Sequence, residues 1–449
     1  MVQENQFSRV LNGRDTLTLA FGAMIGWGWV VLAGDWVETA GTLGAVVAFV
    51  IGGALVCLIA CTYAELATAM PKAGGEHVYS HRALGNFGSF ICTWTIILGY
   101  VSVSAFEAVA LPTVLDHIFD FEHLGHLWQI AGSDVYFTWA LIGSLGAVLV
   151  TVVNIFGVKP AAFLQTVLVT LLIAGGLMLM TGSVVGGNTE NLTPLFADGF
   201  AGVSAVIIMV PFMLVGFDVI PQAAEEINLP FKKIGKTLLA ALALAVAWYV
   251  LIILSVSLAL PAEQIANAEL VTAAASEAGW NSKLAGTFLV IAGVGGIITS
   301  WNAFMVGGSR AIFAMARAKQ LPGFLAYLHP KHNTPVNAIL LIGVLSALAP
   351  LLGSKALVWF VNAGGLGIVI AYGFVALSFL VLRKNEPEME RPYKLKYGNT
   401  VGFLALAAAV GLVALYLPGS PSALVWPWEW LIFIGWSLLG FVFYTMTKR

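Results

Sequence analysis

The sequence predicts an all-α membrane protein with twelve transmembrane helices, and three observations lead to this fold class. Hydrophobic residues make up 59% of the 449 residues, and charged residues only 10%, against an average of about 25%. So few charges cannot cover a water-facing surface, so most of the exterior must contact lipid. Twelve apolar segments are long enough to cross a bilayer as helices. None shows the alternating pattern of a barrel strand.

The twelve predicted spans follow one another with mostly short connections. They cover residues 16–38, 42–69, 88–113, 135–156, 161–182, 201–221, 237–260, 284–308, 335–353, 356–382, 400–417 and 427–446. If the N-terminus is cytoplasmic, 19 of the 21 Lys and Arg residues fall on the cytoplasmic side, and only Lys283 and Lys355 fall outside. Cytoplasmic loops carry an excess of basic residues. We therefore expect a multi-pass protein of the plasma or inner membrane with both termini in the cytoplasm.

Several classes of function are not supported by the sequence. The net charge of -2 comes without a basic patch, which argues against a nucleic-acid partner. The seven histidines lie in predicted loops and form no nucleophile–base pair, so we do not expect an enzyme. A phosphate-binding G-x-x-x-x-G-K-[ST] loop is missing, as is a channel filter repeat. A secondary transporter remains, with the lipid bilayer as its surroundings and no cofactor.

Two predicted spans contain residues that interrupt a helix near mid-membrane. The first holds three glycines within residues 22–28, and the sixth holds Pro211 and Gly216. Irregular backbone at that depth is tolerated where it lines a cavity, and paired breaks indicate a transport site. Spans 1 and 6 are five apart, which predicts a 5+5 inverted repeat. The expected units are residues 1–182, residues 183–384, and two accessory helices in residues 385–449.

Short motifs in a fixed order give the chain a resemblance to a known family. They include the glycine-interrupted first span and the segments Tyr63–Leu66, Pro71–Glu76, Gly216–Asp218, Ala224–Pro230, Ser309–Arg310, Ala314–Arg317, Leu321–Pro322, Thr334–Pro335 and Glu390–Tyr393. Together they resemble the amino acid-polyamine-organocation (APC) superfamily of permeases, closest in span 6 to the cationic-amino-acid-transporter branch. The resemblance implies a secondary active transporter that moves a small amino acid or related amine across the membrane by alternating access, coupled to H⁺ or Na⁺. The alternative is an exchanger without ion coupling.

The resemblance also implies a substrate site at the two breaks. The backbone amides of Trp27 and Gly28 would receive a carboxylate, because a helix N-terminus favours an anion. Carbonyls of Met24, Phe212 and Val215 would receive the α-amine, because a helix C-terminus favours a cation. The ring of Phe212 would act as a gate over the substrate. The full predicted substrate site is Ala23, Met24, Gly26, Trp27, Gly28, Glu107, Phe212, Val215, Asp218 and Phe304.

The sequence does not fix the roles of four residues in this region. Trp27 and Trp29 replace smaller residues of the family, and either pack into the bundle or narrow the pocket, where an indole can attract a cationic amine. Glu107 either reaches water near the outer end of its span, balances a cationic substrate, or accepts a proton. Asp218 follows the sixth-span break, where the resemblance places an acidic gating residue.

The sequence leaves H⁺ and Na⁺ as candidates for the coupling ion. Proton-coupled relatives carry a lysine in the fifth span, but residues 161–181 contain no ionisable residue, and Thr170 is the polar group at about the right depth. Adjacent hydroxyls at Thr299 and Ser300 suit sodium, a hard cation that prefers oxygen ligands. The alternative is that these hydroxyls bond back to their own helix. The predicted sodium ligands are Gly22, Ile25, Gly296, Thr299 and Ser300.

Overall fold

The computed structural model describes residues 7, 9–119, 121–268 and 270–447 and is almost entirely helical in that part. Short 3-10 turns join some of the helices. The helices are α1 (Gly13–Met24), α2 (Gly28–Ala40), α3 (Thr42–Ala69), α4 (Glu76–Phe119), α5 (Phe137–Ile155), α6 (Val158–Gly186), α7 (Gly199–Leu214), α8 (Val219–Gln222), α9 (Phe231–Ala259), α10 (Ala262–Asn267), α11 (Val271–Trp280), α12 (Lys283–Arg317), α13 (Val336–Leu348), α14 (Ala356–Asn385), α15 (Gly398–Tyr416) and α16 (Trp428–Thr447).

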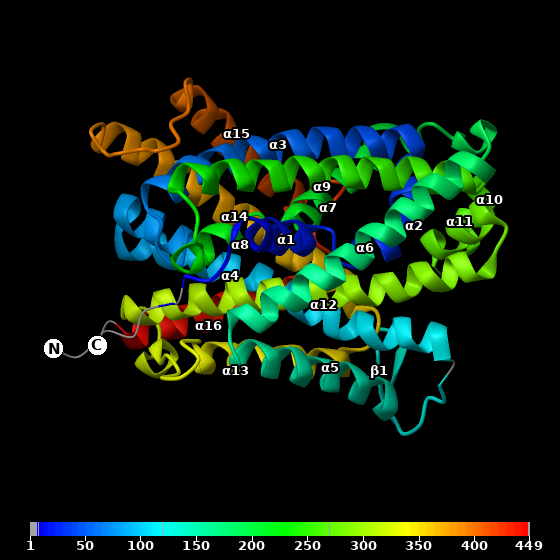
Figure 1. Cartoon of the computed structure of the whole chain (residues 1–449), viewed down its shortest axis with the longest axis horizontal. Helices are drawn as coiled ribbons and strands as arrows, with labels where there is room; N and C mark the ends of the chain where they lie inside the picture. Colours follow the sequence, from blue (N-terminus) through cyan, green and yellow to red (C-terminus); the bar gives the residue numbers. More distant parts are fainter. Residues whose placement is uncertain (1–6, 8, 120, 269, 448–449) are drawn as a thin grey trace.

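The predicted fold class is confirmed. Within the described residues, ten helices are long and apolar enough to cross a membrane, and the bent pair of α1 and α2 forms an eleventh span. The ninth predicted span matches the shorter apolar helix Val336–Leu352. Each predicted segment therefore contains an apolar helix. The long helices lie roughly along one direction (Figure 1). Among the candidate spans of the described residues, α16 is the least buried.

Helix α4 is the longest element and forms one wall of the site. It runs for 44 residues, with a kink at Gly85, whose φ of 71° suits glycine. Further along, α4 packs against α14 and α12. This contact is close because Gly364 of α14 faces the side chain of Ser102, and Gly99 of α4 faces Ile368. The close packing holds the middle of α4 against the two broken spans.

One end of the bundle carries structure that was not predicted from the sequence. At the end that we expect to be extracellular, a two-stranded hairpin forms from β1 (His126–Ile130) and β2 (Ser133–Tyr136). Trp128 Nε1 donates to the Leu351 carbonyl at 2.9 Å. The hairpin therefore covers the connection that leads from α13 to α14. The helices α10 and α11 lie at the same end of the bundle (Figure 1).

Buried ion pairs tie the opposite end together. Glu65 of α3 pairs with Arg383 at 2.6 Å and with Arg391 at 3.0 Å. Arg310 of α12 pairs with Glu226 at 2.8 Å. These contacts connect distant parts of the chain at the end where α1 begins and α16 ends (Figure 1).

Candidate functional site

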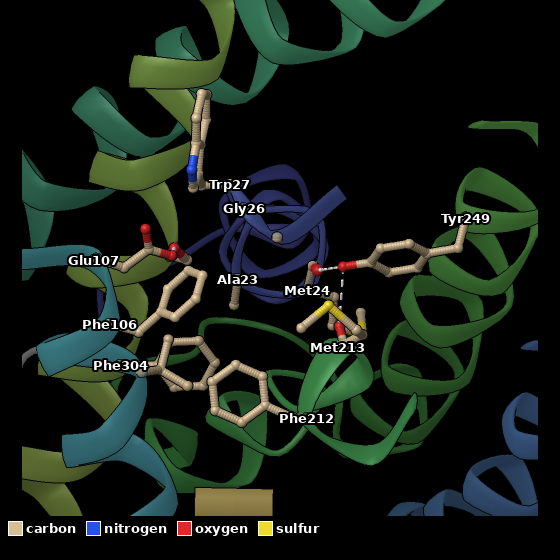
Figure 2. Close-up of a pocket in the computed structure, with 13 residues that line it drawn as sticks. Ala23, Met24, Gly26, Trp27, Phe106, Glu107, Phe212, Met213, Tyr249 and Phe304 are labelled. Atoms are coloured by element: carbon tan, nitrogen blue, oxygen red, sulfur yellow. Dashed lines mark hydrogen bonds between the residues drawn. The ribbon is translucent and has the colours of Figure 1, made fainter. Parts of the chain in front are cut away.

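The two broken spans meet around a small cavity in the middle of the bundle (Figure 2). Its free space is only about 20 Å³, roughly enough for one water molecule. Eight of the ten predicted substrate residues line it, namely Ala23, Met24, Gly26, Trp27, Gly28, Glu107, Phe212 and Phe304. The sequence therefore identified most of this wall, although Val215 and Asp218 do not line the cavity.

The first break lies where the glycines predicted it. Helix α1 ends at Met24 and α2 begins at Gly28, and the two axes differ by 42°. The first amides of a helix have no acceptor within that helix. Trp27, at the N-cap of α2, provides no side-chain hydrogen bond to them. The N-terminus of α2 thus presents uncapped amides at the cavity, which suits an anion.

The second break is held in contact with the first. Helix α7 ends at Leu214, Val215 is extended, and Gly216 has a φ of 129°. A Cβ atom at Gly216 would lie only 2.7 Å from the Cβ of Ala23 and 3.1 Å from the Met24 amide nitrogen. Only glycine fits this close approach. The C-terminal end of α7 therefore reaches the cavity opposite the N-terminus of α2.

Tyr249 of α9 connects the two breaks and was missed by the sequence analysis. Its hydroxyl donates to the Met24 carbonyl at 2.5 Å and lies 3.2 Å from the Met213 carbonyl (Figure 2). The Met24 carbonyl, predicted to receive an amine, thus already accepts one hydrogen bond, although a carbonyl has two lone pairs. A tyrosine in an apolar span gave no signal that it would reach two residues so far away in the sequence.

We expect Tyr249→Phe to weaken substrate binding about tenfold, which corresponds to ~1.4 kcal/mol, because it leaves two helix-end carbonyls without this donor. The half-saturation concentration of amino acid uptake into proteoliposomes measures the effect. Tyr416→Phe is the matched control, because that buried hydroxyl donates to the Ile208 carbonyl at 2.6 Å and does not line the cavity. Equal losses of affinity in both variants would contradict a role for Tyr249 at the site.

The two tryptophans of the first span separate in the structure. Trp27 lines the cavity, and its six-membered ring packs directly against Gly293 of α12. Trp29 packs edge-on against Trp248, with ring centroids 5.6 Å apart, and its Nε1 donates to the Ile25 carbonyl at 2.9 Å. The two tryptophans therefore differ: Trp27 narrows the pocket, and Trp29 packs into the bundle.

Glu107 lies in the wall of the cavity, and its side chain is held by α12. The residue is 2% exposed, so the alternative that it reaches water is wrong. Ser300 donates a hydrogen bond to Oε1, and Oε2 has no partner in the part of the chain that the structure describes. A Cβ at Gly26 would lie 3.3 Å from Oε1, so this carboxyl group sits beside the first break.

Asp218 stabilises the second break from outside the cavity. Its carboxylate accepts hydrogen bonds from the Gly216 amide and the Tyr100 hydroxyl, both at 2.7 Å. The residue is fully buried. It therefore fixes the backbone that reaches the site, and no part of it lines the cavity.

The predicted sodium ligands do not form one set of free oxygen atoms. Thr299 Oγ1 lies 3.3 Å from the Gly22 carbonyl and 2.9 Å from the Gly296 carbonyl, so these three residues come together. The Ile25 carbonyl instead accepts from Trp29, and the Ser300 hydroxyl donates to Glu107. The hydroxyls of Thr299 and Ser300 also contact carbonyls of their own helix, which was the alternative to a sodium site.

The fifth span approaches the first break through a residue that the sequence analysis passed over. Gln165 of α6 is buried, and its side-chain nitrogen lies next to Gly22. Its Oε1 accepts from Asn302 Nδ2 at 3.0 Å, and Asn302 Oδ1 accepts from Asn154 at 2.9 Å. Thr170, named from its depth, bonds instead to the Thr166 carbonyl of its own helix.

Comparison with known proteins gives matches over nearly the whole chain. The family model described as "Amino acid permease" matches residues 11–439. The chain is 29% identical over 454 aligned residues to the "Branched-chain amino acid permease BcaP" of Bacillus subtilis (strain 168), covering 99% of this chain and 94% of that protein. It is 26% identical to the "Methylthioribose transporter" of the same organism, covering 100% and 95%. It is also 26% identical to "Cationic amino acid transporter 7, chloroplastic" of Arabidopsis thaliana, covering 96% and 74%.

Proposed function

Because the chain belongs to the amino acid permease family, we propose that it is a secondary active transporter for a small amino acid or related amine. It would work by alternating access and couple uptake to H⁺ or Na⁺. Members of this family and the similar proteins are transporters and not enzymes. The alternative within this function is an exchanger of amino acids or amines without ion coupling.

The contact between the two helix breaks is the observation that supports this proposal. The uncapped N-terminus of α2 and the C-terminus of α7 meet at one cavity, and Gly216 packs directly on Ala23. The first end favours a carboxylate and the second favours an ammonium group. A zwitterion of amino acid size matches both ends, and its side chain would extend toward the phenylalanine rings shown in Figure 2.

The small cavity supports alternating access through a closed state. A free space of about 20 Å³ is too small for an amino acid. The rings of Phe106 and Phe212 lie edge to face, with centroids 6.0 Å apart, and Phe304 lies beside them (Figure 2). Entry of a substrate therefore requires these rings to move. Phe212, the predicted gate, is placed where such a movement would open the cavity.

A panel of ligands tests the substrate class. Purified protein would be heated with L-leucine, L-alanine, L-lysine, ethylamine or methylthioribose, and active ligands would then be tested for uptake into proteoliposomes. The panel follows the cavity chemistry and includes methylthioribose because a similar protein carries that name. Stabilisation and uptake of an amino acid or amine are expected. If only methylthioribose is carried, the proposed substrate class is wrong. Uptake that follows no sodium or proton gradient but requires internal substrate indicates the exchanger.

We propose that Glu107 is the counter-charge for the substrate amine. Glu107→Gln keeps an oxygen for the Ser300 hydroxyl but removes the charge, so we expect at least about tenfold weaker binding of a cationic amine, or ~1.4 kcal/mol. Titration of the melting temperature with ethylamine and L-lysine measures this. Glu429→Gln is the control, because that buried carboxylate accepts from Asn362 and Val425 at 2.6 Å in the periphery. Unchanged amine affinity in Glu107→Gln would rule out this role.

A further inference from the structure

We propose that a basic pocket at the end of the bundle where α1 begins binds a phosphate-bearing anion. The pocket has a volume of about 850 Å³ and is formed by the segment before α1, the connection from α3 to α4, the start of α4 and the end of α12. We expect this end to face the cytoplasm. The pocket shares no lining residue with the substrate cavity. It is therefore a second site, which goes beyond the proposed transport function.

Basic side chains make up most of the charged lining of this pocket. They are Arg9, Lys72, Arg82 and Arg317. Among the described residues, Glu225 is the one acidic residue in the lining. Arg82 is neutralised by Glu386, at 2.6 Å. The other three basic residues are exposed and form no ion pair within the part of the chain that the structure describes. Positive charge therefore remains in excess even after Glu225 is counted.

The arrangement of these charges matters more than their number. An excess of basic residues is expected at a cytoplasmic end, and the exposed Lys232 in the first turn of α9 belongs to that excess without lining the pocket. Two buried acids at this end, Glu65 and Glu226, already pair with arginines outside the pocket. The lining cations are thus left without these partners. A concave site lined by one sign of charge concentrates ions of the opposite sign.

The chemistry of the lining suits a phosphate group. Guanidinium groups bind phosphate oxygens with two parallel hydrogen bonds, and a lysine ammonium binds phosphate as a point charge. The guanidinium of Arg317 lies over the ring of Phe313, 5.7 Å from its centroid, which helps to orient it. The pocket volume falls in the range of about 300–1,000 Å³ that is usual for ligand sites. An anion with two or more negative charges can therefore contact several of these cations at once.

The pocket joins three segments that are far apart in the sequence. Phe7 lines it and packs edge-on against Phe313 of α12, with ring centroids 5.4 Å apart. Arg9 belongs to the segment that leads into the broken first span, and Lys72 to the connection from α3 to α4. An anion in contact with Arg9, Lys72 and Arg317 would hold these segments together. Its binding would therefore oppose opening of the bundle at this end.

A titration with inorganic pyrophosphate tests the site in the absence of transported substrate. The melting temperature of purified full-length protein in detergent would be measured at one pH, because His77 and His81 also line the pocket and become charged when protonated. Potassium chloride of equal ionic strength is the control for screening. We expect pyrophosphate, and not chloride, to raise the melting temperature with the concentration dependence of a single site.

Four variants locate the binding. Lys72→Gln and Arg317→Gln should each require about tenfold more pyrophosphate for the same stabilisation. Lys232→Gln removes an exposed charge outside the pocket and should respond like the wild type. Glu225→Gln removes the acidic group from the lining and should need about two- to fivefold less pyrophosphate. A general loss of structure would not produce this opposite shift.

A second series identifies the source of the phosphate group. The protein would be placed in nanodiscs of phosphatidylglycerol or of phosphatidylcholine. If a lipid headgroup fills the pocket, phosphatidylglycerol should raise the melting temperature of the wild type, and Lys72→Gln and Arg317→Gln should lose this gain. A soluble anion should act in detergent and in both kinds of nanodisc. In that case, pyrophosphate on the side of the pocket should also slow uptake into proteoliposomes.

Two results would overturn the proposal. One is the absence of saturable stabilisation by both pyrophosphate and phosphatidylglycerol, and the other is an unchanged response in both Lys72→Gln and Arg317→Gln. These two variants change exposed side chains on different segments, so the site stays testable if one of them does not fold. Because the melting experiments contain no transported substrate, their failure leaves the transport function standing, and failed uptake leaves their result standing.

Discussion

Replacing Gly216 with alanine is expected to reduce transport at least about 100-fold, equivalent to ~2.7 kcal/mol, while the protein remains folded. The backbone at this residue has a φ of 129°, which strains any side chain, typically by about 1–3 kcal/mol. The added methyl group would also lie 2.7 Å from the Cβ of Ala23, so the two breaks must separate. The initial rate of uptake into proteoliposomes, per amount of correctly inserted protein, measures the loss.

A second glycine provides the control for this substitution. Gly411 lies in α15. Apart from its own helix backbone and chain neighbours, no atom of the described residues lies within 4 Å of the place where its Cβ would be. Gly411→Ala should transport like the wild type and gain a few tenths of a kcal/mol up to about 1 kcal/mol of stability from helix propensity. If Gly216→Ala transports as well as Gly411→Ala, contact between the two breaks is not needed for the transport cycle.

The sequence predicted the spans and the breaks because both depend on local composition. An apolar stretch of sufficient length must form a helix in lipid, whatever its neighbours are. Glycines in the first span and Pro211 with Gly216 in the sixth likewise act on their own backbone. Helix ends differ from the prediction mainly where a helix continues beyond the apolar stretch into polar residues. The start of α4 at Glu76, twelve residues before the predicted span, is the clearest example.

Contacts between distant segments could not be predicted in the same way. The direction of Trp27 and Trp29 depends on how α2 is rotated after the break, and Tyr249 reaches Met24 across 225 positions of the sequence. Gln165 was missed for the same reason, since its role depends on which face of α6 meets α1. The hairpin of β1 and β2 was missed because it lies in a polar connection without spanning length. Glu107 was found because a charge inside an apolar span needs a reason wherever it points.

Replacing Glu226 with alanine is expected to lower the free energy of unfolding by about 3–5 kcal/mol, because it leaves Arg310 buried without its counter-charge. The pair is bidentate, with Nε to Oε1 at 2.8 Å and Nη2 to Oε2 at 3.2 Å. The side chains are only 1% and 3% exposed. The Glu226 carbonyl also accepts from the amides of Val10 and Leu11, which fixes the segment before α1. Unfolding of the purified protein in a denaturing detergent series measures the difference.

Two further variants separate the buried charge from a general loss of contacts. Arg82 and Glu386 form an ion pair of 2.6 Å with side chains 51% and 31% exposed, so Glu386→Ala should cost only about 0–1 kcal/mol. The double variant Glu226→Leu with Arg310→Met removes both buried charges and should recover most of the stability lost in Glu226→Ala. If the double variant is as unstable as Glu226→Ala, the uncompensated arginine is not the cause, and the pair acts by ordering the segment before α1.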